Sequence, residues 1–115
     1  MGQLYYGSDS VPTLIPDRLL SHLKVVIATK LRRSESFTLS WTRPSDPEAG
    51  RSTIWLQPAI PLRFVFDGSE PEQLDPALLR TLADQANGTG GISVNLDQDV
   101  DVPARARRGQ LATVA

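Results

Sequence analysis

The spacing of the hydrophobic residues switches from a helical to a strand period near residue 34, and this switch constrains the fold more than any other feature of the sequence. Before it, apolar side chains recur every three or four residues: Leu19, Leu20, Leu23, Val26, Ile27 and Leu31. That spacing places them on one side of a helix. After it, residues 36–42 alternate strictly, with Phe37, Leu39 and Trp41 on one face, which is typical of a half-buried strand. The sequence therefore predicts mixed α and β structure.

Turn residues and shorter patterns predict the other elements. We expect the first helix to begin at Pro16 or Asp17 and to end near Arg33, and a second helix to run from Asp75 and Pro76 to the glycine-rich segment 87–91. That segment would end the helix with glycine in a left-handed cap. Five further strands are expected within residues 4–7, 11–15, 51–57, 60–66 and 92–96. The short loops between the three central strands predict an antiparallel meander.

These elements, in the order β-β-α-β-β-β-α-β, predict an α+β fold. We expect a single antiparallel or mixed sheet of five or six strands, with both helices on one face. Residues 1–97 would form one domain, and residues 98–115, where hydrophobicity drops, a flexible C-terminal tail. The uncovered sheet face is polar, so it is where a functional surface is expected.

Charge is distributed unevenly along the chain. Eight of the 12 basic residues lie between Arg18 and Arg63, whereas the segment from Phe64 to Asp101 holds eight of the 13 acids and one base, Arg80. Clustered charges influence which partners a surface attracts, even at a net charge of -1. This distribution suggests two possible partners. One is nucleic acid, and the other is a second copy of this chain, whose acidic segment 64–101 would contact the basic segment 18–63 of the first copy.

Composition excludes several other classes. The chain has no cysteine, so it has no disulfide framework, thiolate nucleophile or cysteine-ligated metal. Its first residues lack the pattern of a secretory signal, and its longest aliphatic run, residues 25–28, is far too short to span a membrane. We expect a soluble, cytoplasmic protein with no membrane partner.

The candidate catalytic and metal-binding residues do not form a recognisable site. His22, the only histidine, falls on the polar side of the first helix with Arg18 and Arg33, so we expect a solvated side chain. The glycine-rich segment follows a helix, whereas phosphate-binding loops precede one. The sequence favours a non-enzymatic role, with no catalytic residue.

The alternating run that begins at Asn95 offers oxygen atoms that could bind calcium. Its members are Asn95, Asp97, Asp99 and Asp101. An EF-hand loop counted from Asp97 needs glycine and glutamate where this chain has Val102 and Arg108. We therefore expect a solvated acidic edge, with no metal and no cofactor.

A stacking and charge platform is the strongest candidate for a binding site. On the polar sheet face it would consist of Trp55, Arg51, Gln57 and Arg63. Exposed aromatic rings and arginines on sheets bind single-stranded nucleic acid in this way. Arg18, Arg32 and Arg33 of the first helix could add phosphate contacts. The alternative is that Trp55 packs against a loop, the tail or a second subunit. Arg105, Arg107 and Arg108 form a further basic cluster, expected to be solvated.

Several short motifs give the chain a resemblance to a known family. They are Leu4-x-Tyr6-Gly7, Leu20-x-x-Leu23-x-Val25-Val26-Ile27, Lys30-Leu31-Arg32-Arg33, Glu35-Ser36-Phe37, Ser40-Trp41, Gly50-Arg51-Ser52-x-Ile54-Trp55 and Pro61-Leu62-x-Phe64. Over about residues 1–96 they resemble a family of short, uncharacterised proteins from high-GC Gram-positive bacteria, some of which carry the label ATP-dependent DNA ligase.

The resemblance implies a compact small domain associated with nucleic acid. A ligase, however, adenylates the lysine of a Lys-x-Asp-Gly motif, and neither Lys24 nor Lys30 lies in such a motif. The sequence thus predicts a small binding or interaction module with nucleic acid as candidate ligand. Self-association as a homodimer is the alternative, and a ligase-related protein is disfavoured.

Overall fold

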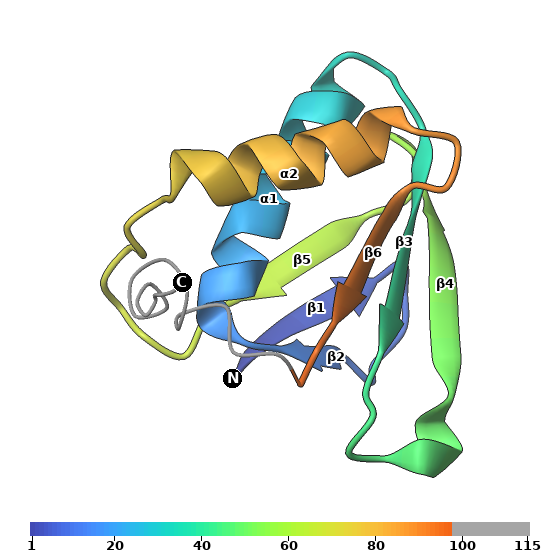
Figure 1. The fold of residues 1–115 in the computed structure, drawn as a ribbon, viewed down its shortest axis with the longest axis vertical. Coiled ribbons are helices and arrows are strands. Elements are labelled where there is room, and N and C mark those ends of the chain that lie inside the picture. The colour runs from blue at the N-terminus through green and yellow to red at the C-terminus, as the bar shows by residue number, and fades with distance from the viewer. Residues whose placement is uncertain (98–115) are drawn as a thin grey trace.

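The computed structural model describes residues 1–97, and its helices and strands follow the predicted order (Figure 1). They are β1 (Gly2–Tyr6), β2 (Thr13–Ile15), α1 (Asp17–Arg32), β3 (Phe37–Thr42), β4 (Arg51–Leu56), β5 (Leu62–Val65), α2 (Pro76–Asn87) and β6 (Ile92–Asn95), with a short 3-10 turn at Pro47–Ala49. The expected tail, with its basic cluster, and the end of the acidic run at Asp99 and Asp101 lie outside the described residues.

The prediction of a single sheet is wrong, because the strands form two sheets of three. One has the order β2-β1-β5 and is antiparallel, and the other has the order β4-β3-β6, with β6 parallel to β3. The expected meander breaks between β4 and β5. Pro58 and Pro61 flank a turn there, in which Ile60 N donates to Gln57 O. The chain then crosses to β1, where Phe64 lies opposite Leu4.

Local chemistry explains the helix ends. Proline precedes α1, and α1 ends with Ser34 at φ 59°, where the Ser34 and Glu35 amides donate to Leu31 O and Lys30 O. These two bonds are those of a Schellman motif, here with serine in place of the usual glycine. At α2 the expected cap is present, since the Asp75 carboxylate accepts from Ala77 N.

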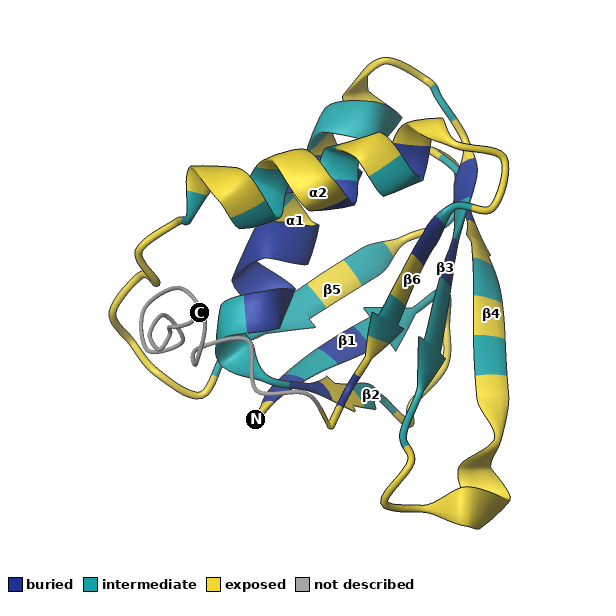
Figure 2. Cartoon of the chain, viewed as in Figure 1, coloured by how far each residue is buried: buried dark blue, intermediate teal, exposed yellow. Residues whose placement is uncertain are grey.

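Both helices and both sheets share one hydrophobic core. The predicted stripe of α1 packs in it, with Leu20 and Leu23 fully inaccessible and Leu31 partly buried, together with Leu4 of β1, Leu39 of β3 and Ile92 of β6. Figure 2 shows buried residues along α1 and the strand interiors, and exposed ones along β4 and the loops. Each fully buried leucine contributes about 1.5 to 3 kcal/mol, so this shared core fixes how the two sheets face the helices.

The expectation that His22 is solvated is also wrong. Its side chain is 0% exposed. The ring lies between α1 and the start of α2: Nδ1 is 2.7 Å from Arg18 O, and Nε2 accepts from Asp75 N at 2.8 Å. The part of this polar side that carries Arg18 and His22 is therefore covered by the segment leading into α2, whereas Arg33 stays exposed.

Side chains connect the two sheets at both ends. The Tyr6 hydroxyl at the end of β1 donates to Trp55 O of β4 at 2.6 Å, and the Arg43 guanidinium after β3 donates to Leu14 O of β2. In Figure 1 both helices lie on the same side of the β4-β3-β6 sheet, and no helix or strand of residues 1–97 covers its other side. We call that uncovered side the outer face.

Candidate binding face on the sheet β4-β3-β6

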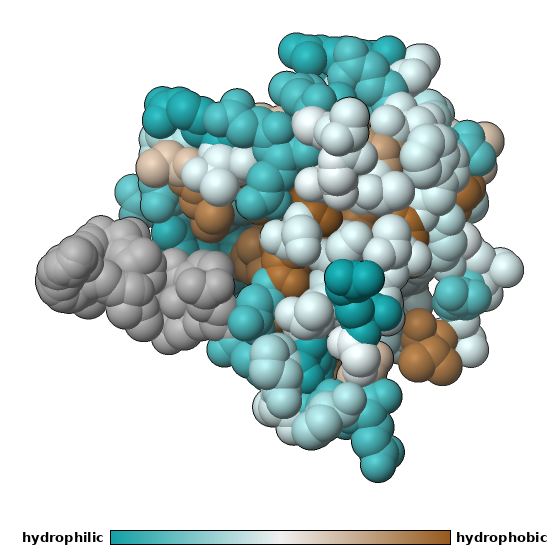
Figure 3. All heavy atoms as spheres, turned by 45° about the vertical axis from the view of Figure 1, so that its right-hand side comes forward, coloured by the Kyte–Doolittle hydropathy of each residue, from teal (hydrophilic) through white to brown (hydrophobic). Residues whose placement is uncertain are grey.

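The outer face is built by strand alternation in three neighbouring strands. Phe37 and Leu39 point inward, so Thr38, Ser40 and Thr42 point outward, and strand register places the alternate residues of β4 and β6 beside them. The outer face consists of Thr38, Ser40, Thr42, Arg51, Thr53, Trp55, Ser93 and Asn95. None of these eight side chains is acidic. Figure 3 shows mostly hydrophilic to neutral colours on this side of the molecule.

Trp55 is the largest side chain on the outer face. It lies opposite Thr38 and is 54% exposed, although tryptophan is usually largely buried in folded proteins. Arg51, two pleats away on the same strand and face, is also exposed. Trp41, by contrast, points inward and packs on the core. The sequence thus predicted the orientation of both tryptophans correctly.

A hollow of about 350 Å³ adjoins Trp55 at one end of the outer face. Thr38 and the loop after α2 line it, together with Lys30. The Lys30 ammonium is already bound, 2.9 Å from Asn87 Oδ1 and 3.0 Å from Glu35 Oε1. The hollow therefore offers Trp55 and hydroxyl groups to a ligand more readily than it offers a free cation.

The other two residues of the predicted platform lie elsewhere. Gln57 follows β4, and its side-chain oxygen accepts from Ala59 N, which stabilises the turn. Arg63 belongs to β5 in the other sheet, where its guanidinium lies 5.4 Å from the ring centre of Tyr5. The two-sheet fold thus separates Arg63 from Trp55 and places it opposite Tyr5, a neighbour that the prediction of a single sheet does not give it.

The three helix arginines also separate. Arg18 donates to Gln73 O and forms an ion pair with Asp75 at 3.4 Å, with only 11% of its side chain exposed, so it has a structural contact at the start of α2. Arg32 and Arg33 are exposed at the end of α1. Arg33 lines a hollow of about 230 Å³ between α1 and α2, away from the outer face.

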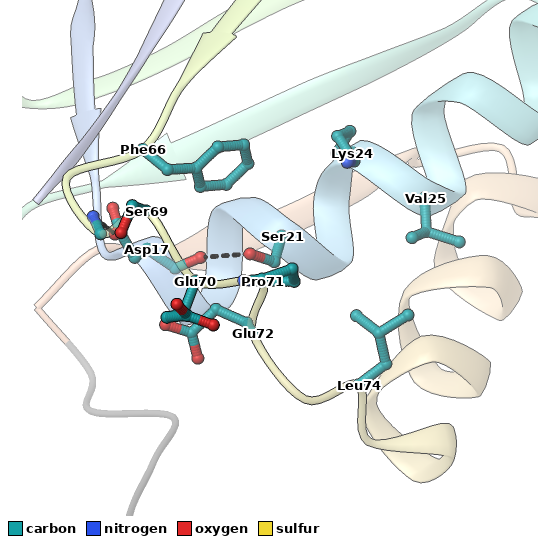
Figure 4. Close-up of a pocket in the computed structure, with 11 residues that line it drawn as sticks. Asp17, Ser21, Lys24, Val25, Phe66, Ser69, Glu70, Pro71, Glu72 and Leu74 are labelled. Atoms are coloured by element: carbon teal, nitrogen blue, oxygen red, sulfur yellow. Dashed lines mark hydrogen bonds between the residues drawn. The ribbon is translucent and has the colours of Figure 1, made fainter.

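A third hollow, of about 300 Å³, lies between α1 and the acidic loop 67–74 (Figure 4). Asp17 and Ser21, which line it on the α1 side, are already hydrogen-bonded. The Asp17 carboxylate accepts from the Asp67 and Gly68 amides, and the Ser21 hydroxyl donates to Asp17 O. Lys24 lies 5.8 Å from the Phe66 ring centre. These contacts anchor the loop on α1, which makes this hollow a weaker candidate than the outer face.

Residues 1–97 contain neither a cluster of metal-binding side chains nor a membrane-spanning helix. No group of three or more histidine, cysteine or acidic side chains is placed to hold a metal ion in this part of the chain. Neither of its helices is long and apolar enough to cross a membrane. The outer face remains the surface with the best support for ligand binding.

Comparison with known proteins gives a family match and nothing closer. No curated protein and no solved structure matches the chain. A family model described as a domain of unknown function, DUF7882, matches residues 1–97. The chain belongs to this DUF7882 family.

Proposed function

We propose that this protein is a binding module for single-stranded nucleic acid and that the outer face is its binding surface. Trp55 stacks on a base, Arg51 contacts a phosphate, and the flanking hydroxyls accept or donate hydrogen bonds. The observation that supports this most is the exposed Trp55 ring within a surface that carries one positive charge and no negative one.

The stacking ring and the single cation of the outer face determine how strongly it is expected to bind single-stranded nucleic acid. Stacking of a base on an aromatic ring contributes about 1 to 3 kcal/mol, and each neutralised phosphate changes the logarithmic salt dependence of single-strand binding by about 0.7. With Arg51 as its single cation, the outer face should bind with modest affinity and a shallow salt dependence. Acidic groups such as Glu70 and Glu72 lie in the loop after β5, so they repel a strand from that side.

The test is fluorescence anisotropy of labelled single-stranded DNA and RNA oligonucleotides at two salt concentrations. Trp55→Ala should weaken binding by about 5-fold to 100-fold, because it removes the stacking ring. Arg51→Ala should weaken it less and flatten the salt dependence. Arg63→Ala removes the same charge from the other sheet and is the matched control, expected to bind like the wild type.

Binding that is unaffected by Trp55→Ala contradicts the proposal, as does a wild type that binds neither oligonucleotide.

A ligase-related activity has no observation in its favour, since Lys24 packs over Phe66 and Lys30 is held by Asn87 and Glu35. Formation of a covalent adenylate with labelled ATP would support a ligase-related activity.

A further inference from the structure

We infer that two copies of this chain associate by pairing their β4 strands. β4 is an edge strand: β3 pairs with one side of it, and within residues 1–97 no strand pairs with the other. In Figure 1 it forms the right-hand border of the fold. With six residues it is longer than the other edge strands, since β2 has three and β5 and β6 have four.

The contact with Tyr6 shows which backbone groups face the open side of β4. Trp55 O accepts from the Tyr6 hydroxyl, so this carbonyl points away from the ladder with β3. Backbone direction alternates along a strand, so the N–H and C=O groups of Arg51 and Thr53 also face the open side. A carbonyl oxygen has two lone pairs, so Trp55 O can accept from both Tyr6 and an added strand.

β4 lacks the features that usually protect an edge from pairing. It contains no proline, and all six of its residues match residues of β3 one to one, so no bulge twists it away. Arg51 is its single charged residue. An exposed edge of this kind is a template for another strand.

A second copy of β4 complements the first. In an antiparallel pair centred on Thr53, Arg51 of each copy lies opposite Trp55 of the other, on the same side of the joined sheet. This places a guanidinium beside an indole at both ends, an attractive pairing of a cation with a ring face, and threonine beside threonine at the two-fold axis. The two outer faces then become one continuous surface across six strands.

Disulfide formation at the axis tests the pairing directly, because the chain has no cysteine of its own. Residues directly opposite each other in a hydrogen-bonded antiparallel pair have Cα atoms about 5.5 Å apart, within the range a disulfide spans. Under mild oxidation Thr53→Cys should form a covalent dimer. Ser93→Cys, on the same face but on β6, is the matched control and should remain monomeric.

Sedimentation of the unmodified protein, without nucleic acid, tests the same pairing in solution. The wild type should change from monomer to dimer mass with rising concentration. Thr53→Lys should remain monomeric because it places two like charges opposite each other, whereas Ser93→Lys, with the same added charge, should dimerise. Circular dichroism checks that both variants fold.

A wild type that is monomeric up to about 1 mM overturns the inference. So does a Thr53→Lys variant that dimerises like the wild type, or a Thr53→Cys variant that cross-links no faster than Ser93→Cys. The inference does not depend on the proposed function, since a dimer that binds no oligonucleotide refutes only the latter.

Discussion

Gly91 fixes the place where the loop after α2 enters the sheet. Its φ is +71°, and a Cβ at this position would lie 2.2 Å from Thr38 Oγ1 and 2.4 Å from Thr38 O. Gly88, which follows α2 directly, has an extended backbone, so the expected left-handed glycine cap of α2 is absent there. The glycine that the fold requires is at the end of the loop, where the chain passes close to β3.

Gly91→Ala should therefore lower the free energy of unfolding by about 2 kcal/mol or more, from the left-handed backbone and the clash with Thr38. Gly90→Ala is the matched control, because no atom lies within 4 Å of a Cβ there. Its effect should stay within about 0.5 kcal/mol. Urea unfolding measures both, and equal losses contradict this account of the loop.

His22 joins the two helices through hydrogen bonds at both ring nitrogens. Asp75 N can only donate, so Nε2 accepts, and the neutral ring carries its proton on Nδ1, from which it donates to Arg18 O. Asp75 also caps α2 and pairs with Arg18. The histidine thus has a structural role in positioning the start of α2.

His22→Ala should lower the free energy of unfolding by about 2 to 4 kcal/mol, because it leaves a cavity and two unsatisfied backbone groups. Arg80→Ala, at an exposed site on α2, should change it by no more than about 0.5 kcal/mol. Nitrogen NMR of the imidazole provides a second check, since a folded-state ring protonated on Nε2 contradicts the assigned hydrogen bonds.

Sequence patterns predicted the orientation of Trp55 but not the burial of His22. Alternation along β4 depends only on the strand's own backbone, so the exposed Trp55 could be read from residues 51–57. The helical projection of α1 shows one apolar side, and it cannot show that a segment more than fifty residues later covers His22 on the other. Long-range contacts of this kind are absent from local periodicity.

At the level of secondary structure, the Tyr6 hydroxyl is a direct link between the two sheets. Tyr6→Phe removes its 2.6 Å hydrogen bond to Trp55 O and should lower the free energy of unfolding by about 1 kcal/mol. Tyr5→Phe is the matched control, because the Tyr5 hydroxyl makes only a 3.4 Å contact with Gln3. Denaturant unfolding of both variants measures the difference, and a larger loss for Tyr5→Phe would falsify this role.

The elements themselves were predictable, whereas their pairing was not. The apolar stripe of α1, the Asp75 cap of α2 and the alternation of β3 all depend on neighbouring residues. Strand pairing depends on where the chain goes after each turn. The short connection between β4 and β5 suggested a hairpin, but the two prolines direct β5 to β1, so Arg63 and Trp55 are in different sheets.

For the whole molecule, the uneven charge along the sequence is partly neutralised within the fold. Arg18 pairs with Asp75, and Arg43 lies 3.9 Å from Asp97, so bases of the middle segment meet acids of the later one. Lys30 pairs with Glu35 nearby. Such ion pairs occupy several basic side chains, so fewer of them can attract an anionic ligand than the sequence suggests. The outer face, which holds Arg51 and no acidic side chain, is therefore the surface where an anionic ligand is expected.

The fluorescence of Trp55 tests the central claim most directly. The chain has two tryptophans, so Trp41→Phe leaves Trp55 as the sole reporter. Titration with a single-stranded oligonucleotide should quench its emission to saturation, at higher oligonucleotide concentrations as salt increases, because a base stacks on the indole. Emission that stays unchanged throughout the titration at low salt would contradict the claim that the outer face binds nucleic acid.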